Sequence, residues 1–305
     1  MTVSVDLSDH PVLSGVVGGQ WPRDVLLVSG PDAVGYLQGQ LSADVVTLEP
    51  GQSTLSLLLA PTGKLQAVLR LWRTDESVVV IDTDRGAGEL VKERLERFLL
   101  RTDARVEPLQ WSCIALRGSG SESVQVGGTG AELVGLGMWP GVDGVDLLGP
   151  SPDVPDGVQV VSGDQLEALR IRAGWPTHPA EVNEGVIPAE IGPWLITAGV
   201  SFTKGCYVGQ ELTARIDSRG NNVPRNLRCV ESDPGQVASV GDDIVVRDDP
   251  TVVCGTVSSA CLDPATGTFV SLGFVKRSAP PDADLVVRAD LDHDPNRPHR
   301  GRYEH

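Results

Sequence analysis

The chain has 305 residues and a formal net charge of −16, and 40% of its residues are hydrophobic. This length and balance are typical of a soluble globular protein with two or three packed units. The acidic surface argues against sequence-independent binding of phosphate backbones, so we expect no direct contact with nucleic acid. The sequence has no run of about 18 apolar residues that could cross a membrane, and its start lacks the basic and apolar regions of a secretory signal.

The chain has five cysteines, an odd number, and no two of them are spaced Cys-x-x-Cys. Histidine is also scarce, with five in the whole sequence. Zinc and iron–sulfur clusters are usually held by closely spaced cysteine and histidine ligands, so we expect no metal site. Free thiols are typical of a reducing compartment, and we therefore expect a cytoplasmic location.

The N-terminal part of the chain predicts a sheet with two helices. Helical spacing of apolar residues predicts one helix after Pro31 and a second over 89–100. Short apolar runs bounded by Gly, Pro or Asp predict strands at 25–30, 55–60, 65–72, 78–81 and 113–116.

The middle of the chain, from 118 to 157, is rich in Gly, Ser, Asp and Pro. We expect short strands there, at 124–126 and 145–148 among others, separated by loops. Residues 164–173 predict a helix with Ser162 as its cap.

After residue 219, short β-rich runs alternate with Gly, Pro and Asp, which predicts a small C-terminal antiparallel β-barrel over 220–290. The strands and helices before it predict an α+β fold of ferredoxin-like halves over 1–219, with two intertwined subdomains and a loop-rich stretch at 118–157. Residues 291–305 are polar and contain proline, and we expect them to be disordered.

One stretch in the second half of the chain combines residue types that suggest chemistry. Gly205 and Gly209 permit tight or left-handed turns on either side of Cys206. A short helix is predicted over 210–216, so Cys206 would lie just before a helix N-terminus, where the free N–H groups and the nearby charge of Lys204 stabilise a thiolate. The alternative is a buried structural cysteine in a tight turn.

Residues 204–211, Lys-Gly-Cys-Tyr-Val-Gly-Gln-Glu, resemble the signature of the YgfZ group of folate-dependent proteins. Two more stretches agree in order: Gly35 to Val45 resembles the family's aromatic-Leu-Gln-Gly-Gln segment, and Pro61 to Lys64 resembles its Gly-Lys hairpin. That group serves iron–sulfur cluster assembly and repair, and it is related to the T-protein (aminomethyltransferase) of the glycine cleavage system. The resemblance covers residues 21 to 276 or so, and it implies the aminomethyltransferase folate-binding fold followed by a barrel.

The resemblance implies a chemical role for Cys206. It implies supporting roles for the other motif residues, which are Lys204, Gly205, Tyr207, Gly209, Gln210, Glu211 and Arg215. Plainer interpretations stay open. Gln210 and Glu211 suit the first turn of any helix, Glu211 and Arg215 could form a surface pair, and Tyr207 could belong to the core.

Two further matched segments also have plainer interpretations. Lys64, with Arg70 nearby, could meet an anionic ligand or could be a solvated turn residue. Gln38 and Asp44 could simply close a helix end.

The resemblance also implies tetrahydrofolate as a cofactor. A pterin site needs an aromatic or apolar slot, a carboxylate or amide for the donor edge of the ring, and a cation for the glutamate tail. Residues of these kinds lie shortly before the motif, although the tryptophans could only pack and the acids could be solvated. The candidates are Arg170, Arg172, Trp175, Glu181, Glu190 and Trp194.

Two positions depart from the pattern of the aminomethyltransferases. Arg172 stands where those relatives usually have a Glu associated with the pterin, and an arginine cannot accept a hydrogen bond from the ring. Gln66 and Ala67 stand at about the positions of their paired Asp residues, one of which is tied to methylene transfer. We conclude that this chain is not a working glycine-cleavage aminomethyltransferase.

Three functions remain open. The first is a folate-dependent accessory protein that uses Cys206 in assembling or repairing iron–sulfur clusters, with iron–sulfur enzymes such as tRNA-modifying radical enzymes, or assembly proteins, as partners. The second is a folate-dependent one-carbon transferase that acts on an unknown substrate. The third is a non-catalytic protein-binding module with a vestigial pocket.

Overall fold

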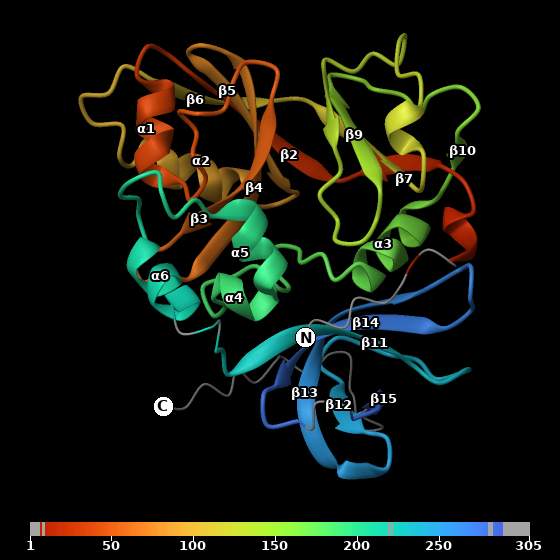
Figure 1. The fold of residues 1–305 in the computed structure, drawn as a ribbon. Coiled ribbons are helices and arrows are strands. Elements are labelled where there is room, and N and C mark those ends of the chain that lie inside the picture. Colours follow the sequence, from red (N-terminus) through yellow and green to blue (C-terminus); the bar gives the residue numbers. More distant parts are fainter. Residues whose placement is uncertain (1–6, 8–9, 219, 221, 280–282, 289–305) are drawn as a thin grey trace.

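The computed structural model describes residues 7, 10–218, 220, 222–279 and 283–288. Within these ranges the chain forms three five-stranded sheets, named here sheets I, II and III. Figure 1 shows sheets I and II next to each other, with sheet III below them and helices at the junction. No helix in the described ranges is long and apolar enough to span a membrane. The α+β class predicted from the sequence is confirmed.

Sheet I is an antiparallel sheet covered on one face by two helices, α1 (Ala33–Gln40) and α2 (Gly88–Glu96) (Figure 1). Along the long central strand the side chains alternate: Leu69 and Leu71 pack beneath the helices, whereas Val68 and Trp72 face the opposite way. A strand with apolar residues on both faces is what the run at 65–72 predicts. The strand order is β3 (Ser53–Leu59), β4 (Leu65–Asp75), β5 (Val78–Asp84), β2 (Arg23–Ser29) and β6 (Arg105–Leu109).

Sheet II has the order β10 (Gln159–Val160), β1 (Val17–Trp21), β7 (Ser112–Arg117), β9 (Gly144–Gly149) and β8 (Leu133–Leu136). The strand predicted at 124–126 is wrong, because a 3-10 helix at Ser121–Ser123 and a bend stand there. The apolar pattern does not reveal β1, because two glycines interrupt it. One of them allows a close approach, since a Cβ on Gly19 would lie 2.8 Å from the carbonyl oxygen of Val161.

Helix α3 (Gly163–Arg172) packs between sheets II and III (Figure 1). Ser162 caps it as predicted: its hydroxyl accepts from the N–H of Gln165 at 3.3 Å, and the Gln165 side chain accepts from the N–H of Ser162 at 3.0 Å. This reciprocal pair satisfies two donors that a helix start leaves free. Two short helices, α4 (Pro188–Ile191) and α5 (Pro193–Gly199), follow.

Sheet III is antiparallel, in the order β11 (Arg225–Glu231), β14 (Phe269–Lys276), β13 (Asp249–Leu262), β12 (Asp243–Val246) and β15 (Leu285–Arg288). The prediction of a closed barrel is wrong, because the described residues of β11 and β15 form no hydrogen-bonded ladder with each other. Closure needs edge strands that tilt and stagger into register. Here the described part of β15 is only four residues long. β11 lies close to β15 and also packs against α4, but no hydrogen-bonded ladder joins the two strands in the described residues. The tail expected at 291–305 lies outside the described residues.

A chain of buried ion pairs joins sheet I to sheet II. Asp82 on β5 accepts from Arg23 Nε and from Arg70 Nε, each at 2.8 Å. Arg70 also donates to Asp146 on β9 at 2.7 Å, and Asp146 accepts from Arg117 at 2.6 Å. All five side chains are buried. Arg70 therefore holds one carboxylate of each sheet and fixes the two sheets against each other.

The two carboxylates of this ion-pair network, those of Asp82 and Asp146, stay ionised despite their burial. Burial by itself raises the pKa of Asp82, but the charges of Arg70 and Arg23 outweigh it and lower the pKa to about 2. Burial likewise opposes ionisation of Asp146, and Arg117 and Arg70 lower its pKa. Removing one member of such a network leaves its partners charged in apolar surroundings, which is far more costly than losing a surface pair.

Asp82→Asn should lower the free energy of unfolding by about 3–5 kcal/mol, because Arg23 and Arg70 would stay buried without their shared carboxylate. Urea unfolding followed by circular dichroism measures the change. The control is Glu96→Gln, which removes an exposed partner of Lys92 on α2 and should leave the midpoint unchanged. An unchanged midpoint for Asp82→Asn would show that these ion pairs do not hold the sheets together.

Candidate functional site

The signature loop, residues 201–209, runs from α5 into helix α6 (Gln210–Ser218) and lies against the end of α1. Lys204 anchors it. Its Nζ donates to three backbone carbonyl oxygens, those of Gln38, Leu41 and Ala43. The end of a helix leaves carbonyls without donors and carries a partial negative charge, so an ammonium group is stabilised there. Burial nevertheless lowers the pKa of Lys204 to about 8, and Asp44 opposes this shift.

Gln38 ties the same two segments together. Its Oε1 accepts from the N–H of Val45 at 2.7 Å, and its Nε2 donates to Asp44 Oδ1 at 3.0 Å and to the carbonyl of Lys204 at 3.4 Å. The N–H of Val208 donates to the carbonyl of Gly39 at 3.2 Å. The stretch at 35–45 and the motif at 204–211 therefore form one hydrogen-bonded unit.

Two glycines bring the third matched stretch into this unit. Gly209 has a φ of +83° and Gly63 a φ of +78°. A Cβ on Gly209 would lie 2.6 Å from the carbonyl oxygen of Ala60, and one on Gly63 would lie 2.5 Å from Leu212 Cβ. Neither position has room for a side chain, because the β3–β4 turn packs directly against the start of α6. Glycine, which has no Cβ, permits this close approach. All three stretches that carry the family resemblance thus meet beside Cys206.

The thiol of Cys206 is exposed, which excludes the alternative of a buried structural cysteine. Cys113 and Cys254 are buried. Burial raises the pKa of Cys229 to about 12 and that of Cys261 to about 11. Among the described residues no group of three or more His, Cys, Asp or Glu side chains is placed to hold a metal ion. Cys206 is the most accessible thiol of the described chain.

Some of the other motif residues are buried and support the loop, and others are exposed on the surface. Tyr207 is buried with its ring centroid 5.0 Å from Lys204 Nζ, and its N–H donates to Gln210 Oε1 at 3.1 Å. Burial raises the pKa of Tyr207. Glu211 and Arg215 are exposed, and the described structure shows no ion pair between them. Exposed charges of both signs therefore lie on α6, the helix that follows the thiol.

Arg172, the first departure from the aminomethyltransferase pattern, fastens sheet III. Its Nε donates to Asp263 at 2.8 Å, and its Nη2 donates to Glu231 at 3.1 Å. His10 also contacts Asp263, at 2.9 Å. Burial opposes the charge of Arg172, but Glu231 and Asp263 raise its pKa. The guanidinium is a structural clamp between α3 and sheet III.

The remaining charged folate candidates are also engaged by the protein. Arg170 donates to Glu167 and, at 2.7 Å, to the carbonyl of Trp175. Glu181 is fully buried and accepts from the hydroxyls of Ser258 and Ser259. Glu190 accepts from the N–H of Ile187 at 3.1 Å and from Arg225 at 3.1 Å.

Trp175 and Trp194 do lie together, stacked with ring centroids 5.5 Å apart. Trp175 also lines a cavity of about 10 Å³ next to Arg23, Arg70 and Trp139, which has room for one water molecule. Neither acid of the set, Glu181 or Glu190, is free to accept from a ring. As placed here, the six candidates do not fit a tetrahydrofolate.

The second departure has a structural role as well. Gln66 Nε2 donates to Glu184 Oε1 at 3.0 Å, and Lys64 Nζ donates to the carbonyl of Gly185 at 3.3 Å. Ala67 is buried under the helices of sheet I. The β3–β4 hairpin thus holds the segment before α4.

The fold is the one seen in the glycine cleavage aminomethyltransferases. The glycine cleavage system aminomethyltransferase T of Bartonella henselae superposes with a TM-score of 0.62, over 86% of this chain and 78% of that one, at 18% identity. This likeness shows the fold.

In sequence the chain is similar to proteins named tRNA-modifying protein YgfZ. It is 28% identical to that of Klebsiella pneumoniae over 294 residues, covering 86% of each chain. It is 28% identical to that of Pectobacterium atrosepticum over 240 residues, covering 72% of this chain and 71% of the relative. No family model matches the chain. The resemblance to the YgfZ group, expected from three stretches, is confirmed.

Sequence reasoning missed the anchoring role of Lys204 and the bridge made by Gln38. Both depend on contacts between segments more than 160 residues apart, such as the one from Gln38 to Lys204. No spacing rule within either segment could reveal them.

Gly209→Ala should lower the free energy of unfolding by about 2–4 kcal/mol, because strain at a positive φ adds to the overlap with Ala60. Gly205→Ala is the matched control. Its φ is +92°, but nothing lies within 4 Å of the added Cβ, so only the backbone strain of about 1–2 kcal/mol remains. Equal losses in urea unfolding would contradict the close packing of the hairpin against α6.

Brief treatment of the folded, reduced protein with iodoacetamide should modify Cys206 before the other four cysteines, because its thiol is exposed. Peptide mass spectrometry over a time course measures the order. Cys206→Ser should remove the fast phase. Faster labelling of Cys229 or Cys261 than of Cys206 would contradict the exposed position of the loop.

Proposed function

We propose that this chain is a folate-dependent accessory protein that supports iron–sulfur enzymes, including those that modify tRNA, through cluster assembly or repair. The thiol of Cys206 is its chemically active group. The observation that carries the proposal is the convergence of the three matched stretches on one exposed thiol. The relatives named tRNA-modifying protein YgfZ support the link to tRNA modification.

The geometry around Cys206 suits a partner protein. The loop beneath it is held rigidly by Lys204, Gln38 and Gly209, whereas the thiol itself faces outward. Exposed Glu211 and Arg215 on α6 offer charges to a docking surface. A thiolate on a rigid support can ligate iron in a cluster carried by another protein. We place this work in the cytoplasm, where thiols stay reduced.

Folate dependence is supported by the fold, which this chain shares with the glycine cleavage aminomethyltransferase. Within this chain the four charged residues first suggested for the ring form ion pairs and hydrogen bonds with other parts of the protein, so the proposal assigns them structural roles. No step of the chemistry is assigned to the folate.

In a host that depends on this protein, Cys206→Ala should reduce the activity of an iron–sulfur tRNA-modifying enzyme to the level of a strain without the protein. The readout is the content of the modified nucleoside in purified tRNA. Cys261→Ala, on the half-buried thiol of β13, is the matched control and should support full activity. Full activity with Cys206→Ala, at equal protein level, would refute a chemical role for the thiol.

A further inference from the structure

Two large apolar side chains are exposed beside the thiol of Cys206. Phe202 lies in the signature loop itself and is 52% exposed, and Val46, on the segment that follows α1, is 57% exposed. Single exposed apolar residues are common on any protein surface, whereas several that gather in one place mark an interaction site. The question is therefore whether these two residues lie close together.

The segments that carry the two residues are bonded to each other. Gln38 accepts from the N–H of Val46 at 3.2 Å, and its Nε2 donates to the carbonyl of Lys204 at 3.4 Å. The N–H of Ser201 donates to the carbonyl of Ser42 at 2.9 Å. Residues 42–48 and 201–206 are thus neighbouring segments, and both reach the surface next to the thiol.

A recess of about 320 Å³ opens between these segments and the end of α5. Leu48 and Val200 supply apolar walls, and Thr47 and Ser201 supply hydroxyls. Asp44 is the one charged residue among those that line it. A recess of this size has room for one side chain of a partner.

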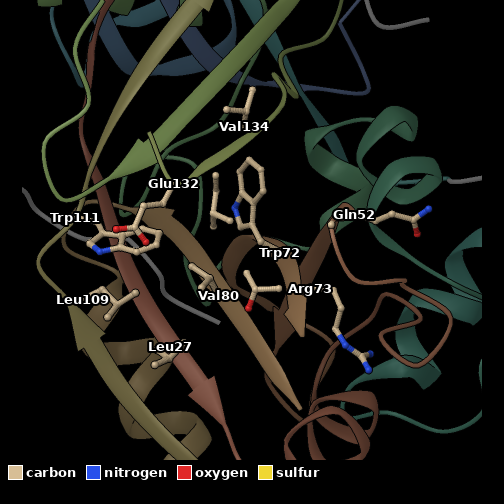
Figure 2. Close-up of a pocket in the computed structure, with 12 residues that line it drawn as sticks. Leu27, Gln52, Trp72, Arg73, Val80, Leu109, Trp111, Glu132 and Val134 are labelled. Atoms are coloured by element: carbon tan, nitrogen blue, oxygen red, sulfur yellow. The ribbon is translucent and has the colours of Figure 1, made fainter. Parts of the chain in front are cut away.

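The segment that carries Val46 is held from inside the protein. Arg73 donates to the carbonyl oxygens of Val45 at 3.3 Å and Leu48 at 3.4 Å. Figure 2 shows Arg73 and Gln52 on the same side of the larger pocket between sheets I and II. Gln52 also lines the recess, so the far end of the segment is tied to sheet I. The surface is therefore built on a fixed backbone.

The charges around the recess balance. Asp44 and exposed Glu49 are its acids, and Lys204 and Arg73 keep their positive charges beneath it. The exposed positions 46, 47, 202, 203, 205 and 206 carry no charge. Charged side chains begin at the edges, with Glu49 on one side and α6 on the other. An uncharged centre with an aromatic residue and a charged rim is the usual anatomy of a protein–protein interface.

We propose that Phe202, Val46 and the recess form the docking surface for an iron–sulfur partner, and that this surface fits an uncharged, apolar patch bordering the partner's cluster. The inference rests on the proposed function, because it names the contact that brings a cluster to Cys206. A charged partner surface would lose its hydration against this centre without gaining a counterion. An apolar one would bury Phe202 and keep water from the iron, as the apolar shell around a metal site does.

The test uses a host that depends on this protein and in which the protein's level is controlled. Phe202→Ser should lower the content of the modified nucleoside in tRNA at low expression, because losing an aromatic anchor weakens docking about tenfold or more. Raising expression by a similar factor should restore it. Cys206→Ala should not be restored at any level. Phe98→Ser, on a phenylalanine 47% exposed just past α2, is the matched control and should behave like the wild type.

The outcomes separate the docking surface from the proposed function. Wild-type nucleoside content with Phe202→Ser and with Val46→Ser, alongside a loss with Cys206→Ala, would overturn the surface and leave the proposed function standing. A loss with Phe202→Ser that expression restores, alongside full activity of Cys206→Ala, would support the surface and refute the role of the thiol. A loss that higher expression does not restore would overturn the surface, because a weakened contact responds to concentration. If Phe202→Ser lowers the melting temperature, Val46→Ser decides the test.

Discussion

The buried ion chain that runs from Arg23 through Asp82, Arg70 and Asp146 to Arg117 is the constraint on which the rest of the structure depends. It crosses from sheet I to sheet II in surroundings with little water, where each charge needs its partner. A second cluster, Arg172 with Asp263 and Glu231, does the same between α3 and sheet III. The three sheets, which share no hydrogen-bonded ladder in the part of the chain that the structure describes, are thereby fixed relative to one another.

That rigid frame explains how an exposed thiol can have a defined position. The loop that carries Cys206 buries the neighbouring side chain of Tyr207 in the core. It is held from below by the three carbonyls that bind Lys204, by the Gln38 bridge and by the contact of Gly209 with the β3–β4 turn. Lys204 and Tyr207 thus support the loop from inside the protein, whereas the neighbouring Cys206 exposes its sulfur.

The charged residues that first suggested a folate site stabilise the fold of this chain through contacts within the protein. Each of three such residues joins the region before α6 to the C-terminal part of the chain: Arg172 donates to Asp263, Glu181 accepts from Ser259 and Glu190 accepts from Arg225.

The sequence by itself determined the α+β class, most strands of sheet I, the Ser162 cap and the turn glycines around Cys206, because these depend on local spacing and backbone freedom. It also carried the family resemblance in three short stretches. Only the tertiary structure decided that sheet III stays open, that Arg172 is a clamp, and that Lys204 is an anchor. Those outcomes depend on which distant carbonyl, carboxylate or strand edge lies within reach. Local patterns in one chain do not encode such distances, because they arise only when the sheets pack.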